Sequence, residues 1–116
     1  MFDWNEYLKA AKKLEREDSE CSKRIAISRA YYAAFNITKK KRIFADSDDF
    51  NGAGSHNRMW NMAFPDDSEI KIRDDALTLK DWRVEADYKN NIYNVDRQAK
   101  LAIRLAEKII NYVSSN

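Results

Sequence analysis

Apolar side chains recur every three or four positions along most of the chain, which is the spacing of one face of an α-helix. The pattern predicts a first amphipathic helix over residues 3–16 and a second helix over residues 20–43. Asp18 and Ser19 separate the two, and Ser19 is a suitable N-cap for the second. The middle of the second helix, "IAISRAYYAAFNI", is apolar on nearly every side, which is typical of the central helix of a bundle.

The next stretch, "ADSDDFNGAGSHN" (residues 45–57), holds both glycines of the chain and predicts a loop. Ser55 is predicted to cap a short third helix over residues 56–64, which Pro65 ends. A fourth helix is predicted to start at residues 66–68 and to end at "KNN", residues 89–91. Its predicted inner stripe consists of Ile72, Ala76, Leu79, Trp82 and Ala86.

The last helix has the most regular pattern, an alternation of three and four residues between apolar positions. Such a heptad seam fits either a helix packed inside one chain or a long coiled coil, and we favour the first. The whole pattern predicts an all-α fold, an antiparallel up-and-down bundle of four to five helices in one domain, residues 1–116. The seam positions are Ile92, Val95, Ala99, Ala102, Ala106, Ile109 and Val113.

Composition removes several classes of function. No apolar run approaches the roughly 18 residues of a membrane span, and the first residues lack the order of a signal peptide, so a cytoplasmic protein is expected. Cys21 is the single cysteine, which excludes an internal disulfide, and it has no evident activating base. With one cysteine and one histidine, a Cys/His zinc site is excluded, and we expect no metal and no cofactor.

Several polar residues fall on faces that the pattern places inside the bundle. Arg83 and Asp87 are four residues apart and therefore share a face of the fourth helix. On the second helix Arg29, Tyr32 and Asn36 form one stripe. Buried charge is costly unless it is paired, so we expect Arg83 to pair with Asp87, and Arg29 with Tyr32 and a distant carboxylate. The cluster is either a structural ion-pair network or the lining of a cleft that binds phosphate.

Two further features carry chemistry. The run Lys39, Lys40, Lys41 and Arg42 ends the second helix, where cations complement the helix dipole, although the run also suits contacts with nucleic-acid phosphates. A net charge of only +2 means that nucleic-acid binding would depend on such a local patch. His56, the single histidine, lies in the Gly/Ser loop and is either solvated or part of a site.

Three segments, "RIAISRAYYAAFN" (24–36), "GSHNRMW" (54–60) and "LKDWRVEADY" (79–88), together resemble the HEPN domain family, in the branch with "SRAYYAAF" and "R-x-x-ADY" helices. The resemblance implies an all-α bundle that commonly forms a homodimer. It also implies a place in a toxin–antitoxin, phage-defence or stress system, and an antitoxin or a minimal nucleotidyltransferase as a possible partner.

Active members of this family are metal-independent ribonucleases with an Arg-x(4–6)-His motif paired across the dimer. The arginine stabilises charge on the phosphate and the histidine moves protons for attack by the 2′-hydroxyl. This sequence departs from the motif, because no arginine stands five to seven positions before His56 and the residue at motif spacing after Arg83 is Tyr88. Asn36 stands where some relatives have histidine. Tyrosine is a poor base at neutral pH, and a salt bridge would keep Asp87 weakly basic.

Three functions follow. The first is a HEPN module without the usual ribonuclease motif that binds RNA, a nucleotide or a partner protein. The second is an active metal-independent ribonuclease toxin with an altered site, and the third is a purely structural dimerisation subunit. The candidate binding residues are Arg29, Tyr32, Asn36, Lys39, Lys40, Lys41, Arg42 and Arg83, and the catalytic candidates are His56, Arg83, Asp87 and Tyr88.

Overall fold

The computed structural model describes residues 1–43 and 52–115. Within these ranges all regular structure is helical, which confirms the predicted all-α class. No helix in the described ranges is both long enough and apolar enough to cross a lipid bilayer. The elements are α1 (Asn5–Glu15), α2 (Glu20–Thr38), the π-helical turn η1 (Lys39–Ile43), α3 (Ser55–Ala63), the 3₁₀ turn η2 (Asp67–Glu69), α4 (Ile70–Tyr88) and α5 (Val95–Ser115).

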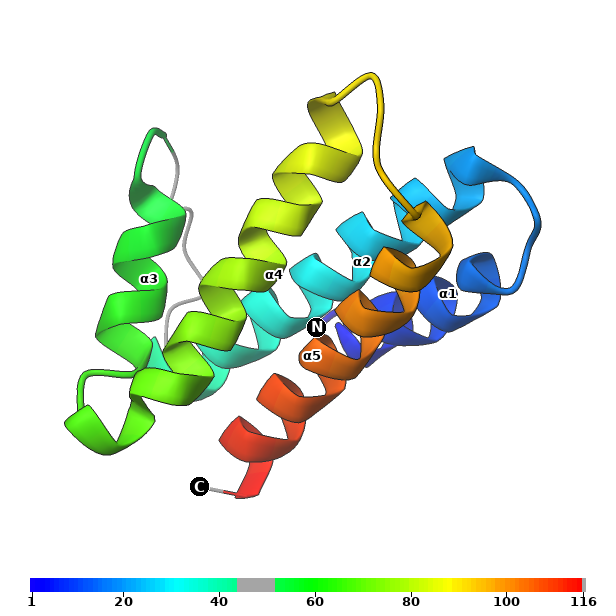
Figure 1. Cartoon of the computed structure of the whole chain (residues 1–116). Coiled ribbons are helices and arrows are strands. Elements are labelled where there is room, and N and C mark those ends of the chain that lie inside the picture. The colour runs from blue at the N-terminus through cyan, green and yellow to red at the C-terminus, as the bar shows by residue number, and fades with distance from the viewer. Residues whose placement is uncertain (44–51, 116) are drawn as a thin grey trace.

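The four longer helices form a bundle in which each runs opposite to the one before it (Figure 1). The central element is α2, which contacts α1, α4 and α5, as its apolar sequence predicts. The short helix α3 stands outside this group, where it contacts η1 and α4. The predicted bundle is therefore confirmed, and α3 closes one side of it near the C-terminal half of α2.

Small side chains line the contacts of α2. Alanine ends at Cβ, so the backbones of neighbouring helices can approach closely wherever it faces a partner. The seam of α5 is buried from Ala99 to Val113 against other helices of the same chain, as we predicted for a bundle helix. The alanines without exposed surface on these two helices are Ala26, Ala30, Ala33 and Ala34 on α2, and Ala99, Ala102 and Ala106 on α5.

Helix ends agree with the prediction in most places. The hydroxyl of Ser19 accepts a hydrogen bond from the backbone N–H of Ser22 at 3.2 Å, so Ser19 caps α2 as expected. The prediction that Ser55 caps α3 is wrong. Ser55 is already helical and donates its hydroxyl to the carbonyl of Gly52 at 2.8 Å, while the cap position is taken by Gly54 with φ 77°. Residues 45–51 of the predicted loop lie outside the described residues.

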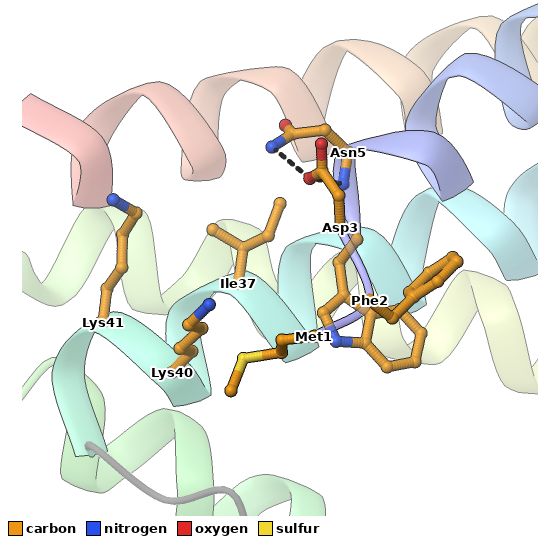
Figure 2. Close-up of a pocket in the computed structure, with 8 residues that line it drawn as sticks. Met1, Phe2, Asp3, Asn5, Ile37, Lys40 and Lys41 are labelled. Carbon is orange, nitrogen blue, oxygen red and sulfur yellow. Dashed lines mark hydrogen bonds between the residues drawn. The ribbon is translucent and has the colours of Figure 1, made fainter.

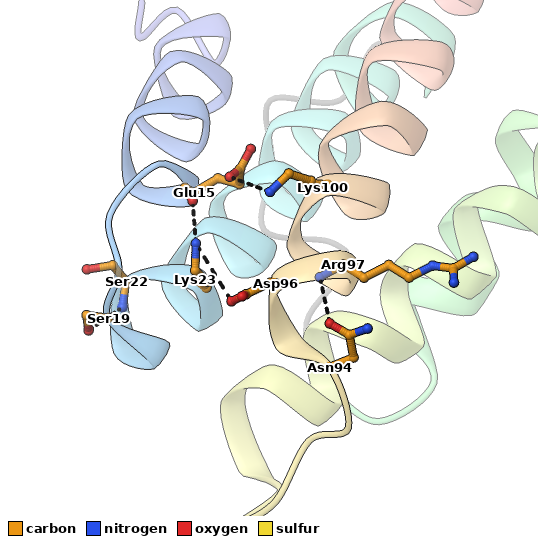
Figure 3. A network of polar contacts seen from close by, with 8 residues as sticks. All are labelled: Glu15, Ser19, Ser22, Lys23, Asn94, Asp96, Arg97 and Lys100. Atoms are coloured by element: carbon orange, nitrogen blue, oxygen red, sulfur yellow. Dashed lines mark hydrogen bonds and ion pairs between the residues drawn. The ribbon is translucent and has the colours of Figure 1, made fainter.

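One end of the bundle is held by a polar network centred on the buried Lys23 (Figure 3). Its ammonium donates to the carbonyl of Glu15 at 2.7 Å and lies 3.8 Å from the carboxylate of Asp96. Lys100 reaches the Glu15 carboxylate at 3.5 Å. These interactions join the end of α1, the start of α2 and the start of α5.

Arg24 ties the same end of α2 to the end of α4. Its guanidinium donates to the carbonyls of Ala86, Lys89 and Asn90, at 3.1, 2.6 and 3.2 Å. The last carbonyls of a helix lack partners within the helix, so a guanidinium placed there satisfies them and complements the helix dipole. The sequence pattern gives no sign of this capping arginine, because its partners are more than sixty residues away.

Arg42 organises the opposite end. Its guanidinium donates to the carbonyl of Ala63 at 3.0 Å and to the carboxylate of Glu69 at 3.1 Å, and lies over the ring of Tyr112. The Tyr112 hydroxyl donates to the same carboxylate at 2.6 Å. Hydrogen bonding from Tyr112, and then from Arg42, holds the pKa of Glu69 below its usual value. Arg42 therefore links η1, α3, η2 and α5.

The tight packing around α2 generates a stability prediction. Replacing the fully buried Ala30 by leucine should lower the free energy of unfolding by about 1–3 kcal/mol, because the added carbons have no space to enter. Urea denaturation measures the change. The exposed substitution Ser114→Leu is the control and should change stability by less than about 0.5 kcal/mol. Equal stability of the Ala30→Leu variant and the unmodified chain would contradict close packing at α2.

Candidate functional site

Arg83 crosses from α4 onto α2. Its guanidinium lies 5.4 Å from the ring centroids of both Tyr31 and Tyr32, and one terminal nitrogen is 3.3 Å from the carboxylate of Asp87. The structure thus contains the predicted pair of Arg83 and Asp87. The Arg83 side chain is 13% exposed, and its Nε is buried without a hydrogen-bond partner in the described part of the chain. The guanidinium therefore has a charge and a donor that its neighbours only partly satisfy.

His56, at the start of α3, packs against the same face of α2. Its imidazole stacks on the ring of Phe35 with centroids 4.1 Å apart and an angle of 17° between the planes. Its Nδ1 is 2.7 Å from the hydroxyl oxygen of Tyr31. The indole N–H of Trp60 donates to that same oxygen at 3.2 Å. A chain of hydrogen bonds thus runs from the buried indole through a buried phenol to a half-buried imidazole.

This chain fixes the orientation of the imidazole. A phenolic hydroxyl can both donate and accept, so Tyr31 can pair with Nδ1 in either neutral tautomer of His56. With Nδ1 paired in this way, Nε2 is left without a partner among residues 1–43 and 52–115. His56 accordingly presents one nitrogen for contact with a ligand while the other is held by the protein.

The surroundings keep His56 neutral. Burial, and then the positive charges of Arg83, Lys80 and Lys39, lower its pKa to about 4. Burial also raises the pKa of Tyr31 far above its usual value, so this phenol stays protonated. Each of the three cations disfavours the protonated form of His56, so all three act on the same imidazole.

We call Arg83, His56, Tyr31, Lys39 and Lys80 the Arg83–His56 site. Lys80 on α4 donates to the side-chain oxygen of Asn57 at 2.8 Å, and the ammonium of Lys39 lies 5.6 Å from the centre of the Phe35 ring. Three cations thus act on a neutral imidazole, while Asp87 pairs with Arg83 and the exposed carboxylate of Asp81 lies 4.0 Å from the Lys80 ammonium. Planar guanidinium groups bind the oxygens of phosphate well, so the arrangement suits an anionic ligand. In the described ranges no three His, Cys, Asp or Glu side chains are grouped as metal ligands.

The structure brings some of the predicted residues together and separates others. Tyr32 lies under Arg83, and Asn36 uses its side chain to donate to the Tyr32 carbonyl at 2.9 Å. The expected pairing of Arg29 with Tyr32 and a carboxylate is wrong, because the Arg29 guanidinium lies over the ring of Tyr7 on α1, 5.1 Å from its centre. Tyr88 is 76% exposed at the end of α4.

The four residues of the basic run, 39–42, also lie in different surroundings. Lys39 belongs to the Arg83–His56 site, and Lys40 and Lys41 are exposed. Arg42, predicted as a member of a surface patch, instead points to Glu69 because that nearly buried carboxylate requires a cationic partner.

The sequence analysis missed Tyr31 and Lys80, and it gave Phe35 and Trp60 no part in the site. A signal was present in the spacing, since Tyr31 and Phe35 are four apart on α2, as are His56 and Trp60 on α3. Two such pairs form short stripes that can face each other. What the spacing lacks is any indication that the two stripes meet.

Because His56 is the single histidine, its titration can be followed by NMR without ambiguity. We predict a midpoint near pH 4, well below the usual 6.5. Arg83→Gln should raise the midpoint by removing a like charge, yet leave it below 6.5 because burial remains. Protonation favours the unfolded chain between these two values, so folded stability should fall as pH drops from about 6.5 to 4. An Arg104→Gln control should leave the midpoint unchanged, and a wild-type midpoint near 6.5 would refute the site.

Comparison with known proteins agrees with this architecture. The family model described as HEPN domain matches residues 5–116, which is nearly the whole chain. Comparison with curated proteins and with solved structures gave no match. The helical bundle, with α2 at its centre, is consistent with the fold of this family. Because this match covers nearly the whole chain, the chain belongs to the HEPN domain family.

Proposed function

We propose that this HEPN domain binds RNA, with a phosphate of the backbone held at the Arg83–His56 site. The observation that carries the proposal is the geometry of Arg83, a largely buried guanidinium with an unpartnered Nε and a single carboxylate neighbour. The Arg83 side chain is still 13% exposed, and a phosphate oxygen is a strong acceptor that would compensate the remaining charge of its guanidinium. Lys39 and Lys80 add two further cations beside the same space.

Family membership favours RNA as the source of that phosphate. HEPN domains occur often in toxin and defence systems and include ribonucleases. Aromatic rings next to the cations, those of Tyr32 and Phe35, suit a single-stranded nucleic acid, whose bases stack on such rings. We place the chain in a toxin–antitoxin, phage-defence or stress system on the same grounds. Members of the family commonly dimerise, and we propose a homodimer for this chain too.

Binding of single-stranded RNA to single-site variants tests the proposal. Arg83→Ala should weaken binding by about 1.5–3 kcal/mol, the value of a hydrogen bond to a charged group, which corresponds to roughly ten- to hundredfold. The slope of log affinity against log salt should decrease by about 0.7, because the variant neutralises one RNA phosphate fewer. Fluorescence anisotropy with labelled RNA measures both quantities.

Two variants make this result specific. Arg83→Lys keeps the charge but removes the planar fork, so it should recover only part of the affinity. Arg104→Ala removes an exposed guanidinium from α5 and should leave affinity nearly unchanged. Circular dichroism checks that each variant is folded. RNA affinity equal to wild type in a folded Arg83→Ala variant would leave a purely structural role for the arginine.

A second candidate, metal-independent RNA cleavage, is favoured by the held imidazole. Its Nδ1 is fixed by Tyr31 and its pKa of about 4 leaves it neutral at physiological pH, so Nε2 can act as a base. In this reaction Nε2 takes the proton of the 2′-hydroxyl and the 2′-oxygen bonds to phosphorus. The bond from phosphorus to the 5′-oxygen then breaks, leaving a cyclic 2′,3′-phosphate and a 5′-hydroxyl that is protonated by water. Arg83 would stabilise the charge that develops on the phosphate.

A pH profile tests the cleavage mechanism. The rate in the presence of a metal chelator should rise with pH through about 4, where His56 loses its proton, and then stay level towards neutrality. His56→Ala should abolish cleavage, whereas Tyr31→Phe, which frees the imidazole, should reduce it. Cleavage that survives in the His56→Ala variant would exclude the histidine as the base.

A further inference from the structure

A pocket lies between the N-terminal residues and the C-terminal part of α2 with the turn η1 that follows it. It encloses about 300 Å³. Figure 2 shows Lys40 and Lys41 of η1 on one side, with Phe2, Asp3 and Asn5 on the other. Ile37 lies between them at the base. The pocket thus combines cations, a hydrogen-bonding edge and apolar surface.

The two lysines of this pocket are not used by the fold. Lys40 and Lys41 are exposed, and neither forms an ion pair within the described ranges. The carboxylate in the pocket is that of Asp3, whose Oδ1 accepts hydrogen bonds from the backbone N–H and side-chain amide of Asn5, both at 3.0 Å. Two ammonium groups against one carboxylate leave an excess of positive charge. Asp3 and Asn5 together also provide an acceptor for the N–H groups found on the edge of every base.

The apolar wall of the pocket is built from ordered aromatic rings. Phe2 is 49% exposed and packs edge-to-face on Trp4, with ring centroids 4.9 Å apart. It also contacts the ring of Tyr7 at 5.6 Å. A half-exposed ring already held by its neighbours loses little conformational freedom on binding, and bases of any sequence stack on such surfaces.

The turn η1 connects this pocket to the Arg83–His56 site. Lys39, Lys40 and Lys41 are the first three residues of this turn. Lys39 faces Phe35 and acts on His56, whereas Lys40 and Lys41 line the pocket. Neighbouring residues of η1 thus take part in the two sites. A nucleic-acid backbone that follows these three lysines would pass from one site to the other.

We infer that the pocket of Phe2, Asp3, Lys40 and Lys41 is a second nucleotide subsite, which takes the neighbouring base and phosphate of a single RNA strand held at the Arg83–His56 site. The inference rests on the proposed function and adds to it the class of substrate, a single-stranded RNA of several nucleotides. Phe2 stacks on the base, Lys40 and Lys41 bind the phosphate, and the Asp3 carboxylate accepts from the base edge. Since all four bases carry such an N–H group, the subsite selects length and single-strandedness rather than sequence.

Comparison of two RNA lengths tests the inference. With a strand of about eight nucleotides, the double variant Lys40→Gln/Lys41→Gln should bind about tenfold more weakly, and the salt slope should decrease by about 1.4, since two cations that neutralise phosphate are removed. With a dinucleotide, which fills only the Arg83–His56 site, the same variant should bind as the wild type does. Phe2→Leu should weaken binding of the longer strand by about tenfold, since it removes the stacking ring but keeps an apolar side chain.

A charge-matched control separates the subsite from general electrostatic attraction. Lys13→Gln/Arg16→Gln removes two exposed cations at the C-terminal end of α1 and should leave both affinities nearly unchanged. The subsite is refuted if the lysine variant binds the longer strand like the wild type, or if the control loses as much affinity. Failure of the proposed function is a different result, in which Arg83→Ala leaves dinucleotide binding unaffected.

Discussion

The candidate site depends on where the fold places the guanidinium of Arg83, between α4 and α2. A charge that is largely removed from water is costly unless other groups compensate it. Asp87 on its own helix supplies one carboxylate, and the rings of Tyr31 and Tyr32 supply the faces that a guanidinium favours. Its buried Nε still lacks an acceptor within the described part of the protein. The guanidinium has one carboxylate neighbour, and the proposed phosphate would be a second negatively charged partner for it.

Other ion pairs of the interior are built around carboxylates. Glu69 receives both Arg42 and the Tyr112 hydroxyl, and Asp75 on α4 receives Lys71 and Lys108, each at 2.6 Å. These carboxylates are surrounded by donors and connect helices at fixed positions. Around His56 three cations act on one imidazole, with Asp87 paired to Arg83 and Asp81 4.0 Å from Lys80. The structural networks are thus centred on a nearly buried carboxylate, whereas the candidate site is centred on a guanidinium and a neutral imidazole.

The sequence could reveal the interactions of this site that are local along the chain, but not those between distant segments. The Arg83–Asp87 pair was predictable, because residues four apart on a helix share a face. The meeting of His56 with Tyr31 and Phe35 was not, since it requires α3 to fold back onto α2 across the loop. For the same reason the sequence could not show that Arg29 faces Tyr7 or that Arg42 faces Glu69. Periodicity identifies the face on which a side chain lies, but the partner on the opposite helix is set by packing.

Side-chain NMR of the protein during titration with single-stranded RNA tests the central claim most directly. The Nε–H signal of Arg83 and the ring signals of His56 report on the two groups that the phosphate should contact. If phosphate binds there, both signals shift together as RNA is added, because the environment of the whole guanidinium and of the imidazole changes. RNA that binds while the signals of Arg83 and His56 stay unchanged would contradict that claim.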